Sequence, residues 1–487
     1  MKDCLIFDRS RSGRKGATLP QLDVPLRNEI PASLRRKKDV ELPELSEPQV
    51  VRHYTNLSRK NFSIDVCFYP LGSCTMKYNP KSHEEVVRLP GFAQLHPLLP
   101  QLLGGGQLTQ GALAVLYEVE QWLNELLGFC AFTMQPMAGA HGELTGVMMI
   151  AAYHQKRGDR QRRYILIPDS AHGTNPASAA IAGFEVKTLP SDAEGNVDMK
   201  RYRELLGPEV AGVMLTCPNT LGLFDPNVED ICRLAHEAGA LVYGDGANLN
   251  AIVGRVRPGD LGFDCMHVNL HKTFSTPHGC GGPGAGVVGV SPILEPFLPI
   301  SRVGKHSDGS FFLNYDFPDS IGYIAPFYGN FGVILRAYAY LLTLGREGLI
   351  QVSENAVLNA NYLRVRLKDV LKPAVDRVCM HEVVLSAKEL AERTGVRALD
   401  LAKGLLQHGY HPPTIYFPLT VPECLMIEPT ETESQEELDE FITVLCELCR
   451  QAEREPDVLH SYPNNLPVRR VDEVKAARNP DIACCSD

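Results

Sequence analysis

Two residues of this chain have side chains whose combined chemistry points to one kind of cofactor. Lys272 lies toward the end of a strand-like run at 264–274 that meets a glycine-rich turn at 277–284, while Asp245 ends the preceding apolar run. A lysine amine condenses with an aldehyde, and a carboxylate beside a pyridine nitrogen keeps that nitrogen protonated and the ring an electron sink. Together, Lys272 and Asp245 predict a site for pyridoxal phosphate (PLP), although neither residue would do so alone.

Each of these two residues also has a simpler explanation. Most lysines at strand ends extend to solvent, and Asp245 could serve only as the first residue of an Asp-Gly turn. However, the charged Lys272 side chain follows an apolar strand and precedes several glycines, which allow a ligand to approach closely. Packing requirements alone explain this order of residues poorly. Because Asp245 ends one predicted strand and Lys272 ends the next, the two can lie side by side across a sheet. We therefore favour the catalytic interpretation.

His172 and the segment around Gly139 offer further contacts to such a cofactor. His172 lies in a His-Gly-Thr-Asn-Pro sequence, where it could cap a turn or stack on a pyridine face, and the spacing does not choose between these roles. Gly139 and Ala140 precede an apolar, helix-like run at 144–153, so backbone N–H groups there could bind a phosphate. An ordinary loop-to-helix turn is the alternative. In either case Glu143, in the first turn of this helix, would interact favourably with the positive end of the helix dipole.

Two patterns that resemble metal sites are not interpreted as such. His267 and His271 have His-x-x-x-His spacing, but in a strand of roughly 3.3 Å per residue their rings would be about 13 Å apart. Cys446 and Cys449 form a CxxC pair inside a helix-like run at 436–453, without a second ligand pair. The sequence therefore predicts no metal.

The composition argues against several classes of partner. Lys and Arg total 48 against 58 Asp and Glu, a net charge of -10, so no general attraction to nucleic acid or anionic lipid is expected. The longest apolar stretches fall short of the roughly 20 residues that cross a bilayer. The first residues lack the apolar segment of a secretory signal. A cytoplasmic location is expected, with a short organelle presequence as the alternative.

The order of predicted elements indicates an α/β fold with a mostly parallel sheet. Residues 1 to about 75 are rich in Pro and Arg and predict an extended arm, 76–350 a large α/β domain, and 351–487 a smaller α+β domain. The strands expected in the large domain are 164–167, 184–189, 210–216, 240–244, 265–270 and 286–290. The smaller domain is expected to contain helices at 353–370, 387–394 and 398–407 and strands at 414–418 and 424–428.

Polar clusters follow four of the strands predicted in the large domain. They lie at 169–176, 217–220, 245–248 and 271–272. Because the loops at the carboxyl ends of parallel strands build the ligand crevice of such sheets, these clusters are expected to meet at one mouth.

Five longer motifs occur between residues 69 and 433. They read Tyr-Pro-Leu-Gly-Ser-Cys-Thr-Met-Lys at 69–77, Asp-Ser-Ala-His-Gly-Thr-Asn-Pro at 169–176, Met-Leu-Thr-Cys-Pro-Asn-Thr-Leu-Gly-Leu at 214–223, Leu-His-Lys-Thr-Phe-Ser-Thr-Pro-His-Gly-Cys-Gly-Gly-Pro-Gly at 270–284 and Met-Ile-Glu-Pro-Thr-Glu-Thr-Glu at 426–433. Together they closely resemble the P-protein family, glycine dehydrogenase (decarboxylating), in particular subunit 2 of its two-subunit bacterial form. The resemblance runs from near the amino terminus to at least residue 470.

The resemblance implies a fold-type I PLP enzyme of the glycine cleavage system and a role for each candidate residue. Lys272 would bind the cofactor covalently, and Asp245 would pair with the pyridine nitrogen. His172 would stack on the ring, and Gly139 and Ala140 would contact the phosphate. These roles agree with the chemistry suggested by the residues themselves.

The resemblance also implies a reaction and partners. Glycine would lose its carboxylate as carbon dioxide, and its aminomethyl group would pass to the lipoyl arm of the glycine cleavage H-protein. Family members of this length pair with a homologous subunit 1 in an α2β2 heterotetramer. The arm at 1–75 could wrap around a neighbouring subunit in such an assembly. Cys280 stands where the family pattern leads us to expect glycine, which puts the contacts of its loop in doubt.

Other contacts and other functions stay open. Asn248 and His271 are further candidate contacts to the cofactor. The residues that could bind the glycine carboxylate or assist proton transfer are unranked and comprise His141, Asn248, His271, Thr273 and His278. The competing functions are another PLP enzyme on this fold, such as an amino acid decarboxylase or sulfur lyase, and a non-catalytic subunit. The presence of both Lys272 and Asp245 argues against the non-catalytic subunit, which would need neither.

Overall fold

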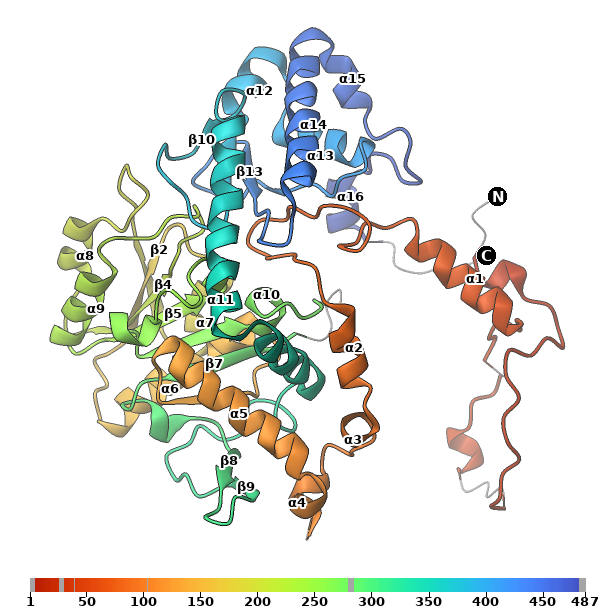
Figure 1. Cartoon of the computed structure of the whole chain (residues 1–487), viewed down its shortest axis with the longest axis vertical. Helices are drawn as coiled ribbons and strands as arrows, with labels where there is room; N and C mark the ends of the chain where they lie inside the picture. Colours follow the sequence, from red (N-terminus) through yellow and green to blue (C-terminus); the bar gives the residue numbers. More distant parts are fainter. Residues whose placement is uncertain (1–4, 26–29, 39, 103, 279–283, 481–487) are drawn as a thin grey trace. The chain divides into compact units, whose positions relative to one another are not determined.

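The computed structural model describes residues 5–25, 30–38, 40–102, 104–278 and 284–480 (Figure 1). The chain divides into two compact units. The first comprises the residues up to Ser63 together with Asn465–Val468, and the second comprises Ile64–Asn464 and the residues from Arg469 onward. The domain boundaries predicted near residues 75 and 350 remain predictions.

The first unit has little hydrophobic interior of its own. Among its described residues, Leu45 is the only buried hydrophobic side chain. Its helix α1 (Glu47–Ser58) starts with a capping box, in which the Gln49 side chain accepts a hydrogen bond from the Ser46 backbone N–H at 3.0 Å. Its two short 3-10 turns are η1 (Phe7–Arg9) and η2 (Ala32–Leu34).

The second unit contains a seven-stranded sheet in the order β1-β7-β6-β5-β4-β2-β3. Strands β2 to β6 run parallel, whereas β7 is antiparallel to both of its neighbours, so the predicted mostly parallel sheet is confirmed. The strands are β1 (Ala131–Thr133), β2 (Tyr164–Pro168), β3 (Glu185–Leu189), β4 (Val210–Thr216), β5 (Leu241–Gly246), β6 (Cys265–Asn269) and β7 (Gly286–Val290). The sequence did not reveal β1, because three buried residues are too few to show a period.

Helices cover both faces of this sheet (Figure 1), which is why its strands read as continuous apolar runs. Side chains of α6, such as Met149 and Ile150, pack with Met214 on one face. Side chains of α5 and α9 pack with Val242 on the other face. The helices between residues 110 and 237 that accompany this sheet are α5 (Gln110–Leu127), α6 (Gly139–Lys156), α7 (Thr174–Ile181), α8 (Met199–Leu205) and α9 (Val228–Glu237).

A smaller antiparallel sheet, in the order β10-β11-β13-β12, forms a second core. The strands are β10 (Lys372–Pro373), β11 (Val383–Ser386), β12 (Thr414–Ile415) and β13 (Cys424–Ile427), and the helices beside them are α12 (Lys388–Thr394), α13 (Ala398–Gln407), α14 (Gln435–Arg454) and α15 (Pro456–Ser461). The α+β character of this part is as predicted. The sequence did not reveal β10 and β11.

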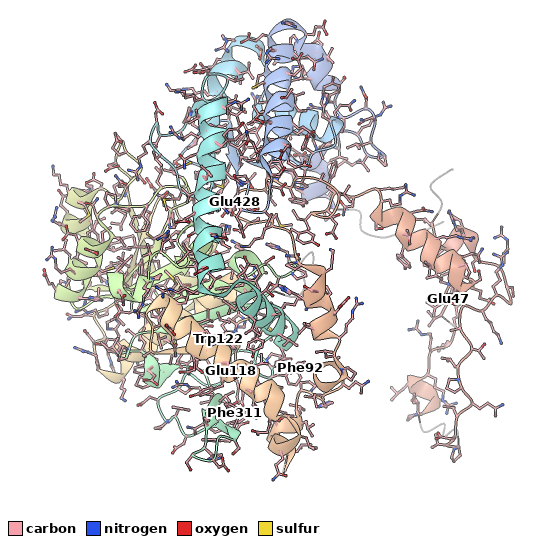
Figure 2. All side chains as sticks on the ribbon, viewed as in Figure 1. Glu47, Phe92, Glu118, Trp122, Phe311 and Glu428 are labelled. Carbon is pink, nitrogen blue, oxygen red and sulfur yellow. The ribbon has the colours of Figure 1, made fainter. Side chains whose placement is uncertain are left out.

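Helix α11 (Phe331–Leu367) runs from the large sheet to the small one and changes direction at Gly345, whose φ is 59° (Figure 1). The predicted helix at 353–370 is therefore only its second half. Trp122 and Glu118 of α5 lie against its first half (Figure 2): the Trp122 ring stacks on Tyr338 at 4.9 Å, and the Tyr338 hydroxyl donates to Glu118 at 2.7 Å.

The remaining elements are short. They are α2 (Lys81–Val87), α3 (Pro90–Ala93), η3 (Leu99–Gln101), α4 (Gly105–Leu108), η4 (Leu249–Ala251), η5 (Pro258–Leu261), α10 (Leu270–Thr273), η6 (Glu295–Phe297), β8 (Arg302–Lys305), β9 (Phe311–Asn314) and α16 (Glu473–Arg478). None of the helices in the described ranges is both long and apolar enough to cross a bilayer.

A buried ion pair joins the segment after Ile64 to both cores. The Lys77 ammonium donates to Glu431 and to Asn250, each at 2.7 Å, and the Lys77 side chain is only 1% exposed. Burial lowers the pKa of Lys77, and the Glu431 carboxylate opposes that shift. Because a buried charge is tolerated only with such partners, this contact fixes where the segment lies.

Lys77→Met should therefore destabilise the protein strongly. The substitution removes the cation from Glu431 and leaves it only neutral donors, Asn250 and Tyr340. Loss of one member of a buried pair costs about 3–5 kcal/mol. The free energy of unfolding, measured with denaturant, would show this loss. Lys81→Met is the matched control, since Lys81 pairs with Asp65 at 2.7 Å in an exposed position, and such pairs contribute about 1 kcal/mol or less. Equal effects of the two substitutions would contradict this account.

Candidate active site

Lys272 lies just beyond the carboxyl end of β6. The strand ends at Asn269, and Lys272 belongs to the single helical turn α10, so it follows the strand rather than ending it as the sequence suggested. Its side chain is half-buried, and its amine donates a hydrogen bond to the Ser73 carbonyl oxygen at 2.8 Å. The amine is therefore held inside the protein rather than extended to solvent.

Asp245 lies at the corresponding end of β5, beside β6. The strand register pairs Asp245 with Thr216 of β4 on one side and with His267 of β6 on the other. The Asp245 carboxylate is 2% exposed, accepts a hydrogen bond from the Ala247 N–H at 3.0 Å, and lies 3.4 Å from His267 Nε2. The sheet therefore presents a buried carboxylate at the mouth where the sequence predicted one.

A chain of polar side chains extends from Asp245 in two directions. The Tyr243 hydroxyl and His267 Nδ1 are hydrogen-bonded at 2.5 Å. With its amide nitrogen facing the carboxylates, Asn175 donates to Glu143 at 2.8 Å and to Asp245 at 3.3 Å. Burial, followed by the nearby Asp245 carboxylate, raises the pKa of Glu143 to about 8. Glu143 is thus protonated at neutral pH.

Lys272 and Asp245 act electrostatically on the same histidines. Burial lowers the pKa of His267, while Asp245 raises it and Lys272 lowers it further. The same three influences act on the pKa of His172. Both charged side chains therefore influence the pKa values of both rings.

His172 makes the capping contact that the sequence allowed. Its Nδ1 accepts a hydrogen bond from the Thr174 N–H at 3.2 Å, at the start of α7, and lies 2.8 Å from the Thr174 hydroxyl. The residue is nevertheless exposed. Its ring packs edge-on against the Phe417 ring, with 5.7 Å between the ring centroids. A capped nitrogen leaves a ring face available, so the stacking role stays a prediction.

Gly139 and Ala140 are the first two residues of α6, which begins five residues before the predicted run at 144–153. The N-cap residue Ala138 offers no side-chain acceptor to the first N–H groups of this helix. A Cβ on Gly139 would lie 2.6 Å from the Asn269 side-chain nitrogen, so only glycine fits there. Glu143 consequently lies beyond the first turn and faces Asp245, and the expected contribution to the helix dipole was wrong.

Asn248 and His271 have contacts within the protein. Asn248 is buried and donates to the Pro218 carbonyl at 2.9 Å, which fixes the loop after β4. His271 Nδ1 accepts from the Ala285 N–H at 3.3 Å. Burial, followed by His278 and Lys272, lowers the pKa of His271 to about 3, so its ring is neutral. Whether either residue also contacts a cofactor stays a prediction.

The other unranked candidates lie around the same mouth. His141 Nδ1 accepts a hydrogen bond from the Met137 N–H at 3.3 Å, and the His278 ring lies 5.0 Å from that of His271. The Thr273 side chain is fully buried. Cys280, whose departure from glycine raised doubt about its loop, lies outside the described residues.

Several site residues were missed in the sequence. Glu143, Asn175 and Tyr243 gave no signal because only the tertiary structure brings them to Asp245. Glu382 and Glu428 contact the loop at 73–75, which in turn accepts the hydrogen bond of Lys272. The motif at 69–77 was noted only for its family resemblance, and its unusual Gly-Ser-Cys-Thr sequence was the available signal.

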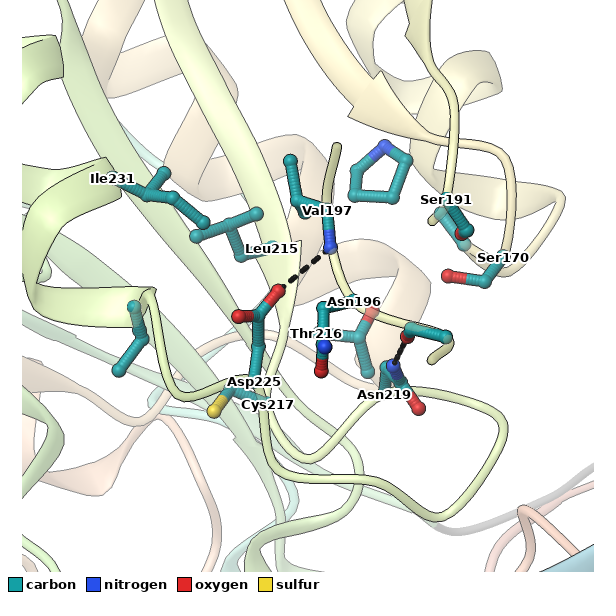
Figure 3. A pocket seen from close by; sticks show the side chains of 14 residues that line it. Ser170, Ser191, Asn196, Val197, Leu215, Thr216, Cys217, Asn219, Asp225 and Ile231 are labelled. Atoms are coloured by element: carbon teal, nitrogen blue, oxygen red, sulfur yellow. Dashed lines mark hydrogen bonds between the residues drawn. The ribbon is translucent and has the colours of Figure 1, made fainter. Parts of the chain in front are cut away.

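A small pocket lies at the ends of β2 and β4 (Figure 3). Its volume of about 20 Å³ has room for roughly one water molecule and none for a substrate. Two of its polar side chains are already paired: Asp225 accepts from the Val197 N–H, and Asn219 donates to the Gly195 carbonyl, both at 2.8 Å. The pocket is therefore structural.

Comparison with known proteins decides the family of this chain. Residues 143–315 match the family model described as aminotransferase class-V, and residues 352–465 match glycine dehydrogenase, C-terminal domain. The probable glycine dehydrogenase (decarboxylating) subunit 2 of Caldanaerobacter subterraneus subsp. tengcongensis is 57% identical over 482 residues, 98% of each chain. The protein of the same name from Pyrococcus furiosus is 52% identical over 98% of this chain and 95% of its own.

This chain belongs to the glycine dehydrogenase (decarboxylating) subunit 2 family. Among solved structures, the fold is similar to that of a glycine decarboxylase (P-protein) of the glycine cleavage system in inhibitor-bound form, with a TM-score of 0.71 and 21% identity over 86% of this chain and 93% of that one. It is also similar to a cysteine desulfurase from Thermococcus onnurineus NA1, with a TM-score of 0.59 and 17% identity over 79% and 95%. These matches confirm the fold-type I architecture that was predicted for this chain.

Glu143 should make the stability of the protein fall as the pH rises from about 5 to 8. In this window the folded state keeps a proton that unfolded Glu143 has released, so stability decreases by at most about 1.4 kcal/mol per pH unit. Glu143→Gln, which mimics the protonated form, should remove this slope. Unfolding midpoints measured from pH 5 to 9 would show it, with exposed Glu185→Gln as the control. Parallel curves for wild type and Glu143→Gln would contradict the assignment.

Proposed function

We propose that this protein is a PLP-dependent enzyme that decarboxylates glycine and transfers the aminomethyl group to the lipoyl arm of the glycine cleavage H-protein, with release of carbon dioxide. The observation that carries the proposal is the geometry at the carboxyl ends of the adjacent strands β5 and β6. Asp245 is buried 3.4 Å from His267 of β6, and Lys272 follows β6 with its amine bound to the Ser73 carbonyl at 2.8 Å. The names of the relatives support glycine as the substrate.

The residues present fit PLP. Lys272 offers a half-buried amine for the aldehyde, and Asp245 offers a buried carboxylate for the pyridine nitrogen. Gly139 and Ala140 offer the uncapped N-terminus of an 18-residue helix for the phosphate. Lys272 and Asp245 lie at the carboxyl ends of β6 and β5, and the exposed His172 follows the carboxyl end of β2.

Each of these residues has a task in the reaction. PLP, when bound, supplies the electron sink that stabilises the negative charge left on the substrate carbon as carbon dioxide leaves. Asp245 keeps that sink effective by favouring a proton on the ring nitrogen, and His267 orients Asp245 through the contact at 3.4 Å. Tyr243 fixes the His267 ring in turn. Lys272 accepts and releases the cofactor.

The proposal includes partners and a location. The words "subunit 2" in the names of the relatives support a pairing with subunit 1, and we propose an α2β2 heterotetramer. The lipoylated H-protein is the proposed acceptor, and the cytoplasm is the proposed location. Neither nucleic acid nor membrane is a proposed partner, in keeping with the net charge of -10.

Lys272→Ala should abolish covalent attachment of PLP. Wild-type protein mixed with PLP should show an absorbance band that borohydride eliminates, and peptide mass mapping should then find the pyridoxyl group on Lys272. The variant should show neither. Lys200→Ala, on the exposed surface of α8, is the control and should behave as wild type. A reducible band that persists in Lys272→Ala would refute the assignment.

Asp245→Asn should lower the rate of glycine decarboxylation while PLP remains bound. Removing one electrostatic group of this kind lowers rates about 100- to 1,000-fold. The assay is H-protein-dependent exchange of the glycine carboxyl group with labelled bicarbonate, with subunit 1 present. Asp225→Asn, at the structural pocket beside β4, is the matched control and should keep the exchange rate. Exchange that proceeds without H-protein would instead favour another PLP enzyme of this fold.

A further inference from the structure

The loop Ser73-Cys74-Thr75 has a conformation that its own residues do not favour. Ser73 has φ 63° and Thr75 has φ 48°, in the left-handed region that residues other than glycine rarely adopt. Such backbone costs on the order of 1 kcal/mol or more per residue and persists only where the surroundings impose it. Contacts from elsewhere in the protein must therefore hold this loop.

Two buried carboxylates hold the loop from one side. Glu382 Oε2 accepts a hydrogen bond from the Ser73 N–H, and Glu428 Oε2 accepts one from the Thr75 N–H, both at 2.8 Å. Both glutamates are fully buried. They adjoin the paired ends of β11 and β13, where Val383 is opposite Ile427. The small sheet therefore fixes the loop through two buried hydrogen bonds.

The other side of the loop faces the active site. The Ser73 carbonyl oxygen accepts the hydrogen bond of the Lys272 amine at 2.8 Å, and the Cys74 carbonyl oxygen lies 2.8 Å from His278 Nε2. Ser73 thus has its N–H bound to Glu382 and its carbonyl bound to Lys272. A shift of Glu382 would move the acceptor of the lysine.

We propose that Glu382 and Glu428 are positioning residues that hold the Ser73 carbonyl as the resting acceptor for the free amine of Lys272. The inference rests on the proposed function, in which an amine substrate displaces Lys272 from the cofactor. During that interval the lysine has a free amine that must stay near the cofactor in order to return. The strained loop supplies a fixed acceptor for it.

The surroundings of the two glutamates agree with a positioning role. Their remaining oxygens, both Oε1, have no hydrogen-bond partner among the described residues, so the loop amides are the groups that these carboxylates bind. His381 Nε2 lies 3.9 Å from Glu382 Oε2 and from Glu428 Oε1. Ligand atoms on a tetrahedral zinc with bonds of about 2.1 Å would be only about 3.4 Å apart. The cluster is therefore too wide for such a metal site.

Burial and mutual repulsion limit the charge of this cluster. Burial, followed by the Glu428 carboxylate, raises the pKa of Glu382, and burial raises that of Glu428 to about 7. The Lys272 ammonium lowers both pKa values. Burial lowers the pKa of His381 to about 3, so its ring is neutral. The Lys77 ammonium also lowers the pKa of Glu428, but the cation that acts on both glutamates is the same amine that the loop binds.

The test compares Glu382→Ala and Glu428→Ala with wild type in the full-length chain freed of cofactor. Hydrogen exchange of the peptide covering 71–77 should become about 10- to 100-fold faster, as expected when a buried N–H loses its acceptor. The rate at which Lys272 is acylated by an amine-reactive reagent should change as well, because its acceptor is no longer fixed. Glu382→Gln and Glu428→Gln keep an acceptor oxygen and should restore slow exchange.

Glu423→Ala is the matched control. Glu423 also accepts a backbone hydrogen bond, from the Ala398 N–H at 2.9 Å, but it precedes β13 at the end remote from the loop. It should leave both readouts unchanged. If Glu382→Ala does not fold, Glu382→Asp, which withdraws the carboxylate by one methylene, should give intermediate exchange.

Unchanged exchange and unchanged Lys272 reactivity in folded Glu382 and Glu428 variants would overturn the inference. Both measurements are made without cofactor, so they test only whether Glu382 and Glu428 hold the loop at 73–75. The proposed function fails separately, if wild-type protein does not attach PLP to Lys272. In the loaded enzyme, the alanine variants should also return the cofactor to Lys272 more slowly after glycine is removed. Borohydride reduction followed by peptide mapping of the pyridoxyl group on Lys272 would show this.

Discussion

The buried carboxylate of Asp245 is the constraint around which the site is organised. A charge at that depth is tolerated only with hydrogen bonds and neighbouring charges, and the sheet supplies them from three directions. The Ala247 N–H, the Asn175 amide and His267 surround it, and Lys272 follows the adjacent strand. Glu143 is kept neutral in the same place, first by its burial and then by the neighbouring Asp245 carboxylate.

Directional polar contacts, rather than apolar packing alone, connect the small sheet to Lys272. Apolar side chains tolerate small shifts against one another, whereas a hydrogen bond of 2.8 Å fixes both partners. The pair formed by Lys77 and Glu431 fixes one end of the segment at 73–77, and Glu382 and Glu428 fix the other. The position of the Lys272 amine thus depends on residues more than 100 positions away in sequence.

The large sheet could be predicted because its strands are buried on both faces and separated by helices of regular length. All six predicted strands lie within two residues of their observed ends. The start of α6 could not be predicted, since Gly139 and Gly142 are poor helix formers and are present because the backbone of α6 packs closely on β6 and β7. The role of Glu143 was misread for the same reason: its position depends on where that helix starts.

The sequence by itself determined the alternation of strands and helices, the order of polar clusters at strand ends, and the presence of an amine and a carboxylate suited to one cofactor. These follow from local patterns, because periodicity and residue type are written along the chain. Only the tertiary structure decided that Glu143 faces Asp245, that Glu382 and Glu428 hold the loop beneath Lys272, and which carboxylates lose their charge. Such facts depend on distance and burial, which arise when segments remote in sequence pack together.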